Sequence, residues 1–305
     1  MKKFVLKRVL ISIVLLFFVT MIIYGIMRCM PTSFVENKAR ELAQKPGSKT
    51  YQEWKEQLDE AYGLDSGVVQ GYCHWASQAV RGQFGDSWYW NKPVLDKFAE
   101  VIWYSFALGL ASFILEIIIA IPAGIAAARR QYSALDYTIT VIALIGISLP
   151  SFFFATILKW VFSIKLGWVD LYGIVGRMHD QMSPIGQILD MAQHMILPTI
   201  TLSIVSIGSL MRYTRTNMLE VLNADYIRTA RAKGVPEKQV INRHAFRNTL
   251  IPLVTTLGGS LPGLFSGALI TETLFGIRGI GYASYTSMTQ ADIPFVMFYL
   301  AFISI

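Results

Sequence analysis

Six stretches of this chain are strongly apolar and separated by polar links, and each is interpreted as one membrane-spanning helix. A hydrocarbon core of about 30 Å needs about 20 apolar residues in one helix. The pattern therefore predicts an all-α, polytopic membrane protein with six transmembrane helices. The expected spans lie at about 9–27, 101–128, 137–164, 194–212, 251–275 and 292–305.

The two terminal stretches need separate interpretation. The first run, Val9 to Met27, is longer than the roughly 7–15 residues of a signal-peptide core, and no small-x-small cleavage site follows it. Residues 1–30 are therefore expected to form an uncleaved helix with its N-terminus inside. The last stretch, from Asp292 to Ile305, gives only about 21 Å of helix at 1.5 Å per residue. We therefore expect the sequence to stop within the sixth helix.

Residues 31–98 are more polar, with several prolines, four tryptophans and nearly balanced charges. Within them, "SKTYQEWKEQLDEAYGL" predicts an amphipathic helix, because Trp54, Leu58 and Tyr62 are four residues apart. We expect a folded extracytoplasmic segment here, since a loop this long crosses the membrane largely regardless of its charge.

Composition and charge agree with a membrane protein. Only 15% of the residues are charged, against about a quarter in soluble domains, and the net charge is +7. Basic clusters alternate with apolar spans, as the positive-inside rule expects, so links 129–136 and 213–250 are expected in the cytoplasm and 165–193 and 276–291 outside. Nucleic-acid binding is disfavoured, because the spans separate the clusters and no aromatic residues interleave them. The basic clusters are Lys2, Lys3, Lys7 and Arg8; Arg129 and Arg130; and Arg212 to Arg247.

No motif predicts catalysis, a cofactor or a metal site in this chain. The sequence has no Walker-type phosphate loop, and "GIRGIG" at Gly276 is interpreted as an extracytoplasmic turn. The histidines make no paired-ligand spacing; "RMHDQM" around His179 favours a polar loop, with contact to a soft metal as the alternative. Cys29 and Cys73 leave two free thiols and one disulfide both open.

Three ionisable residues fall within or near the spans. Glu116 lies near the middle of the second span, and two interpretations stay open: a pathway-facing carboxylate, or a protonated one bonded to a neighbouring helix. Lys159, near the outer end of the third, can snorkel, and a structural role is preferred. Glu272 is expected to cap a helix or line an interface. Prolines and the "LGGS" run would loosen the spans and fit a moving bundle.

The link 213–250 predicts two short helices with a break between them. Asn223 or Asp225 can cap the first helix, at about 226–233. Gly234 offers the left-handed conformation that ends a helix, and Pro236 suits the start of the next.

The first of these helices has small residues at Ala230 and Ala232, between the basic residues Arg228, Arg231 and Lys233. This combination of small and basic side chains favours a helix that is held in the groove of another protein.

The link 213–250 also resembles a segment of a known protein family. "ADYIRTARAKG", followed by "RHAFRNTLIP", resembles the cytoplasmic EAA loop of membrane subunits in binding-protein-dependent ABC importers, and more narrowly the peptide (oligopeptide, dipeptide and related nickel) permease branch. The resemblance covers nearly the whole chain. The other matching pieces are "LKRVLISIVLLFFVTMIIYGIMRCMP", "GQFGDSW", "SLPSFFFATILKWVFSIKLGWV" and "TETLFGIRGIG".

The resemblance implies a type I importer permease core over residues 99–305, with a coupling helix that docks on a partner ATPase. Two positions depart from the broad pattern, which has Glu at Arg228 and a Pro near Arg247. The residues expected at the ATPase contact are Tyr226, Arg228, Thr229, Ala230, Arg231, Lys233 and Gly234.

The implied function is transport of peptides through half of a translocation pathway, with nickel or another small solute as the alternative. The resemblance implies a homologous second permease, two ATPases that bind ATP and Mg²⁺, and an extracytoplasmic binding lipoprotein, in a bacterial plasma (inner) membrane. The chain itself would be a transport subunit and not an enzyme.

The residues disfavour two other classes of membrane protein. A secondary carrier would need ion-binding carboxylates at broken helices, whereas only Glu116 stands out. A membrane enzyme or sensor would need a polar catalytic cluster or a signalling domain, and the sequence suggests neither.

Overall fold

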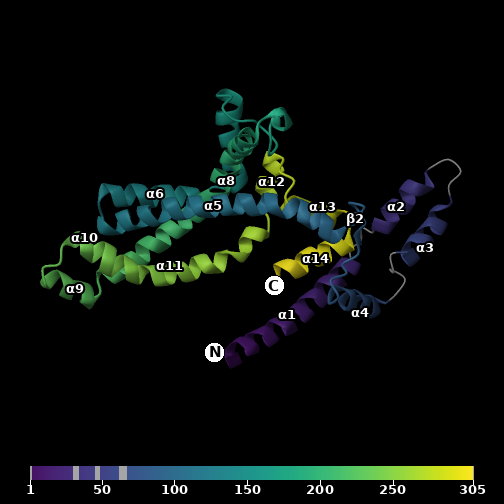
Figure 1. Cartoon of the computed structure of the whole chain (residues 1–305), viewed down its shortest axis with the longest axis horizontal. Coiled ribbons are helices and arrows are strands. Elements are labelled where there is room, and N and C mark those ends of the chain that lie inside the picture. Colours follow the sequence, from purple (N-terminus) through teal and green to yellow (C-terminus); the bar gives the residue numbers. More distant parts are fainter. Residues whose placement is uncertain (1, 30–33, 45–48, 62–66, 305) are drawn as a thin grey trace. The chain divides into compact units, whose positions relative to one another are not determined.

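The computed structural model describes residues 2–29, 34–44, 49–61 and 67–304. They form two compact units, one of Met1–Ile102 with Ile280–Ile305 and the other of Trp103–Gly279. Apart from one two-stranded ribbon, the regular structure of the described residues is helical, which confirms the predicted all-α class. The two units are described separately (Figure 1).

The first unit is built around three helices, α1 (Lys2–Arg28), α4 (Val68–Ala79) and α14 (Ile293–Ile303). Tyr24, Tyr72 and Met297 bring one buried side chain from each helix into a shared apolar cluster. The hydroxyls of Thr20 and Tyr72 lie 3.0 Å apart, so α1 and α4 are also joined by a buried hydrogen bond. α1 otherwise leaves most of its apolar side chains exposed, as expected of a helix that faces lipid.

The amphipathic helix predicted between α1 and α4 is present as α3 (Tyr51–Ala61), after α2 (Phe34–Ala43). Thr50 and Glu53 form a capping box: the Thr50 N–H donates to Glu53 Oε2 at 2.8 Å, and the Glu53 N–H lies 3.4 Å from Thr50 Oγ1. Tyr62, the last member of the predicted apolar spacing, lies outside the described residues.

A short antiparallel ribbon of β1 (Asp86–Ser87) and β2 (Lys92–Pro93) precedes the long helices. Asp292, fully buried, accepts a hydrogen bond from the Ser87 hydroxyl and one from the Trp88 N–H. This carboxylate therefore joins the ribbon to the start of α14. Cys29 and Cys73 are both exposed and free, so of the two open alternatives the structure has the free thiols.

The second unit holds the remaining long helices. Seen by itself in Figure 1, it has α9 and α10 at one end and α12 at the other. α5 (Val94–Arg129) begins in the first unit and continues into the second, and α13 (Ile280–Thr289) belongs to the first unit. The other elements of the second unit are α6 (Ala134–Ser148), α7 (Ser151–Leu158), the π-helical segment η1 (Lys159–Lys165), η2 (His179–Gln181), α8 (Pro184–Leu222), α9 (Asp225–Ala232), α10 (Glu237–Gln239), the π-helical segment η3 (Val240–Ala245), α11 (Phe246–Ser260), η4 (Pro262–Phe265) and α12 (Leu269–Phe275).

Two of the predicted spans are bent. The stretch 137–164 turns by 104° between α6 and α7, because Pro150 disfavours helical backbone in the residue before it and Leu149 is extended. The stretch 251–275 turns by 52° before α12. Both bends lie in predicted spans that contain prolines, which agrees with the expectation that prolines loosen these helices.

Among the described residues, three helices, α1, α5 and α8, are long and apolar enough to cross a membrane, and each bent pair can count as a further span. The shorter apolar helix α14 occupies the sixth predicted stretch. By these apolar helices the chain is a multi-pass membrane protein.

Glycines allow α8 to pack closely against two neighbours. A Cβ at Gly124 of α5 would lie 2.7 Å from the Met211 carbonyl oxygen, and one at Gly208 would lie 2.7 Å from the Ala143 carbonyl oxygen. Any larger residue would force these backbones apart. Helices in membranes use small residues for this kind of close contact.

Candidate functional site

The predicted interaction helix is present as α9, and its boundaries differ slightly from the prediction. It begins at Asp225 after Ala224, with no side-chain cap, so the expected cap by Asn223 or Asp225 is wrong. Asn223 instead ends α8, and its amide donates to the Leu219 carbonyl at 2.9 Å. Gly234 follows the helix with φ +76°, the left-handed conformation that the sequence predicted.

α9 is attached to the rest of the unit chiefly by one buried apolar side chain, Ile227. Ile227 is 0% exposed and lies in a cluster with Met218 of α8 and with Val240, Ile241 and Ala245 of η3. Full burial of an isoleucine stabilises a fold by about 1.5–3 kcal/mol. Because α9 has only eight residues, its position depends on this contact.

Most other predicted contact residues of α9 point away from that cluster. Tyr226 is 47% exposed, the Arg228 side chain is 70% exposed, and Thr229 and Lys233 are also exposed. Ala230 differs, because it is partly buried against the Ile227 cluster. We call the exposed set, Tyr226, Arg228, Thr229 and Lys233, the free face of α9.

Arg231 is used within the loop itself. Its guanidinium donates to both Glu237 carboxylate oxygens, at 3.1 and 2.7 Å, and so closes the turn between α9 and α10. The hydrogen bond from Arg231 lowers the pKa of Glu237 below its ordinary value. Arg231 therefore braces the loop, in addition to any contact that it makes outside the chain.

A second ion pair, between Asp136 of α6 and Arg215 of α8, was not predicted from the sequence. The Arg215 guanidinium donates to both oxygens of Asp136, at 2.6 and 2.8 Å. The Tyr132 N–H also donates to Asp136, at 3.0 Å. The sequence does contain a helix-start signal, since Ser133 lies three residues before Asp136. It contains no signal that pairs Asp136 with Arg215, which is 79 positions away.

A cavity of about 570 Å³ contains Glu116, the other candidate residue. It is lined by α5, α8, α11 and η4, all within the second unit. Glu116 is partly buried and makes no hydrogen bond or ion pair within the described parts of the chain. The lining is otherwise apolar or hydroxyl-bearing. The hydroxyl-bearing residues are Ser112, Ser206, Ser209, Tyr213, Thr256 and Ser260.

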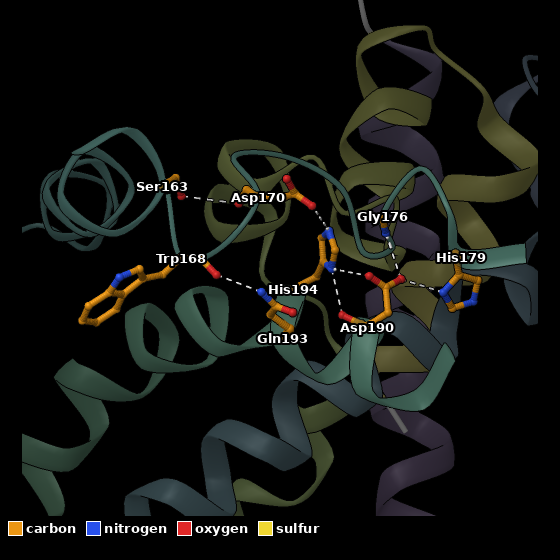
Figure 2. Close-up of polar contacts among 8 residues, drawn as sticks. All are labelled: Ser163, Trp168, Asp170, Gly176, His179, Asp190, Gln193 and His194. Atoms are coloured by element: carbon orange, nitrogen blue, oxygen red, sulfur yellow. Dashed lines mark hydrogen bonds and ion pairs between the residues drawn. The ribbon is translucent and has the colours of Figure 1, made fainter. Parts of the chain in front are cut away.

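The segment between η1 and α8, residues 166–183, is held by a polar network (Figure 2). Asp190 of α8 accepts from the Gly176 N–H at 2.9 Å and lies 2.7 Å from His179 Nδ1. His194, one turn further along, contacts the Asp190 carbonyl at 2.8 Å through Nδ1 and Asp170 Oδ2 at 3.0 Å through Nε2. We call residues 166–183 the α7–α8 loop.

The same network decides between the two interpretations of "RMHDQM", a polar loop or a contact to a soft metal. His179 contacts a carboxylate of its own chain, which supports the polar-loop interpretation. Within the described ranges, no group of three His, Cys, Asp or Glu side chains could hold a metal ion.

Lys159 and Glu272 both have structural roles at the outer end of the bent spans. Lys159 is only 8% exposed; its ammonium group donates to the Leu274 carbonyl and lies 3.7 Å from the centre of the Tyr172 ring. Snorkelling was therefore the wrong interpretation, and the structural role is confirmed. Glu272 accepts from the Ala268 N–H at 2.9 Å at the start of α12, as expected of a capping acid.

The glycines of "GIRGIG" are used for backbone conformation and packing. Gly276 ends α12 with φ +68°. A Cβ at Gly279 would overlap the Ser105 hydroxyl and the Glu272 carboxyl group. The motif is thus a turn, as predicted from the sequence.

Comparison with known proteins gives one family. Residues 120–305 match the model of the family described as binding-protein-dependent transport system inner membrane component. The oligopeptide transport system permease protein AppB of Bacillus subtilis is 36% identical over 298 residues, which cover 97% of this chain and 90% of the relative. OppB of Salmonella typhimurium is 34% identical over 298 residues, with the same coverage.

A solved structure shares the fold. A chain in the inward-facing MetNI methionine ABC transporter aligns with a TM-score of 0.50 and 16% identity, covering 68% of this chain and 91% of that one. With the family match over more than half of the sequence, this protein belongs to the binding-protein-dependent transport system inner membrane components.

Proposed function

We propose that the chain is the permease subunit of an ATP-driven importer and forms half of a translocation pathway for peptides. The support for the cargo is that similar chains, covered over 90% of their length, are named oligopeptide permeases. The chain would supply the membrane pathway, and ATP hydrolysis would take place in partner subunits.

One observation carries the coupling part of the proposal. α9 buries Ile227 in its own protein while Tyr226 and Arg228 remain exposed. Arg228 makes an ion pair of 3.6 Å with Asp225 in which both side chains are highly exposed. An exposed tyrosine and arginine on a helix with a fixed apolar attachment suit docking in a groove of a partner, because Tyr and Arg are favoured at interface centres. The partner would be an ATPase that binds ATP and Mg²⁺.

The remaining partners follow from the same proposal. A second, homologous permease would complete the pathway, two ATPases would lie beneath the pair, and an extracytoplasmic lipoprotein would deliver the peptide. The N-terminus and α9 would then face the cytoplasm of a bacterium, and residues 31–98 and the α7–α8 loop would face outward. ATP binding would draw the two docking helices together and shift the bundle between inward- and outward-facing states.

Glu116 and its cavity would line the pathway. A carboxylate within a membrane helix is costly unless it pairs or faces water, and this one has no partner within the described residues. The polar side-chain atoms of the cavity lining are oxygens, whereas nickel favours nitrogen and sulfur ligands. This chemistry favours peptide over nickel as cargo.

The proposal is tested with the complete complex, reconstituted in vesicles with its partner permease, ATPases and binding protein. The double variant Tyr226→Ala/Arg228→Glu should lower ATPase stimulation by peptide-loaded binding protein roughly tenfold or more, because two interface anchors are lost. Lys238→Glu is the matched control: it reverses an exposed basic residue of the same loop, outside the free face of α9.

The control should change stimulation by less than about twofold. Assembly is measured in parallel, by co-purification of the ATPases with each variant. Full stimulation in the double variant would contradict the docking role of α9. Failure of the unaltered complex to take up any peptide would contradict the proposed cargo.

A further inference from the structure

The cavity around Glu116 has the size of a ligand site. Its volume of about 570 Å³ falls within the range of roughly 300–1,000 Å³ that is usual for small-molecule pockets. Residues of α5, α8, α11 and η4 converge on it, so it is formed by elements far apart in the sequence.

Of the described residues, Glu116 is the one carboxylate that lines the cavity, and no described Lys, Arg or His residue lines it. Throughout the described residues, the Glu116 carboxyl group has neither a hydrogen bond nor an ion pair. A lone carboxylate in a mostly apolar cavity creates a site where a positive charge is favoured.

The hydroxyls around Glu116 are oriented in a way that strengthens this preference. Ser209, Thr256 and Ser260 each donate to a carbonyl oxygen four residues earlier in their own helix, at 2.9, 3.1 and 3.2 Å. Because their hydrogens are already used, these hydroxyls present lone pairs to any further partner. Ser112 likewise donates to the Thr199 carbonyl, at 3.3 Å.

An occupant of this cavity would therefore meet acceptors on several sides and one negative charge. An ammonium group has three donors and no acceptor, and so matches such a lining. A carboxylate or phosphate would meet repulsion from Glu116 and little donation. The chemistry thus selects a primary amine in its charged form.

We propose that the Glu116 cavity is a subsite that holds a charged amino group of the peptide during its passage. This inference rests on the proposed function, since it names the part of the cargo that the pathway recognises. Glu116 makes the charge-assisted hydrogen bond, and the serine and threonine oxygens complete the shell. The amino group can come from the peptide N-terminus or from a lysine side chain.

The test uses the reconstituted complex and three peptides of equal length that the binding protein retains. One has a free N-terminus and no lysine, one is N-acetylated with a single lysine, and one is N-acetylated with norleucine in place of that lysine. Uptake is measured from pre-loaded binding protein, for the unaltered complex and for Glu116→Gln. Glu220→Gln is the control, because it removes the charge of an exposed carboxylate of α8 that does not line the cavity.

Glu116→Gln should lower uptake of at least one of the two amine-bearing peptides by about tenfold, as the loss of one charge-assisted hydrogen bond predicts, and change that of the norleucine peptide by less than about twofold. Glu116→Asp should restore part of the loss. The amine-bearing peptide that is affected identifies the source of the ammonium group.

An equal effect on all three peptides, including no effect, would overturn the subsite while leaving peptide import intact. If the unaltered complex imports none of the peptides, the proposed function fails first. An effect of Glu220→Gln as large as that of Glu116→Gln would also overturn the proposal, because the charge would then act without regard to position.

Discussion

The α9 loop, residues 223–239 between α8 and η3, and the α7–α8 loop lie in the same unit and are held by opposite means. The α9 loop is attached through a buried isoleucine, and its polar side chains at Tyr226 and Arg228 stay exposed. The α7–α8 loop is attached through polar groups, because Asp190 and His194 bind it at several points (Figure 2).

The difference indicates which loop has chemistry left for a partner. A loop that is held by buried polar groups offers fewer of them to a partner, whereas an apolar attachment leaves its tyrosine and arginine side chains exposed at the surface. The sequence of each loop contains histidines or arginines, so the presence of such residues alone does not distinguish the two. Four variants test this comparison.

The largest effect is expected from Ile227→Asp. It places a carboxylate in an apolar cluster and should destabilise the α9 loop by more than about 3 kcal/mol. The loop should then become sensitive to limited proteolysis in the detergent-solubilised protein. Tyr226→Asp, at an exposed neighbouring position, should resist the protease like the unaltered chain; equal sensitivity of both would contradict the attachment through Ile227.

Asp190→Ala should have the next largest effect, about 2–3 kcal/mol, because it leaves the Gly176 N–H and His179 without their carboxylate and removes one of the two carboxylates beside His194. A lower thermal midpoint and faster amide exchange in residues 166–183 are the expected readouts. Asp180→Ala removes an exposed carboxylate from the same loop. An equal loss in that control would mean that charge, and not the network, holds the loop.

Gly234→Ala should cost about 1–2 kcal/mol, because φ +76° is unfavourable for a residue with a Cβ even though the space around it is open. The readout is the thermal midpoint of the solubilised protein. Gly258→Ala, at a helical glycine with equally open space, should leave stability unchanged or raise it. The opposite order would show that Gly234 is not held in the left-handed conformation.

The smallest effect concerns the Arg231–Glu237 pair. The pKa of Glu237 in the folded chain lies below its ordinary value. The ion pair therefore stabilises the loop fully at pH values above the ordinary pKa, and this contribution is lost as the pH falls through the folded-state pKa. Both side chains are largely exposed, so the contribution is about 0.5 kcal/mol or less. Glu237→Gln should flatten this part of the stability profile between about pH 5 and pH 3.

Local features were predicted best from the sequence. The apolar runs, the helix around Trp54 and the left-handed Gly234 depend on neighbouring residues, and the structure agrees with each. The turn directions at Pro150 and before α12 were not predictable, because packing against other helices decides them. Nor could the sequence separate Ala230, which faces its own cluster, from the exposed residues beside it.

Polar pairs between residues far apart in the sequence could not be predicted either. Asp136 with Arg215, and Asp190 with His179, join positions whose proximity follows only from the folded arrangement of α6, α8 and the α7–α8 loop. Whether the free face of α9 meets an ATPase, and whether Glu116 lines a pathway, stay predictions that the experiments above address.

α8 runs without interruption from Pro184 to Leu222, and its 39 residues correspond to about 58 Å of helix. It carries Asp190 near one end, and only Asn223 and Ala224 separate its other end from α9. Such a helix acts as a lever arm: a tilt of about 5° around one end displaces the other by about 5 Å. A tilt of α8 imposed at its α9 end would therefore also move the residues that anchor the α7–α8 loop.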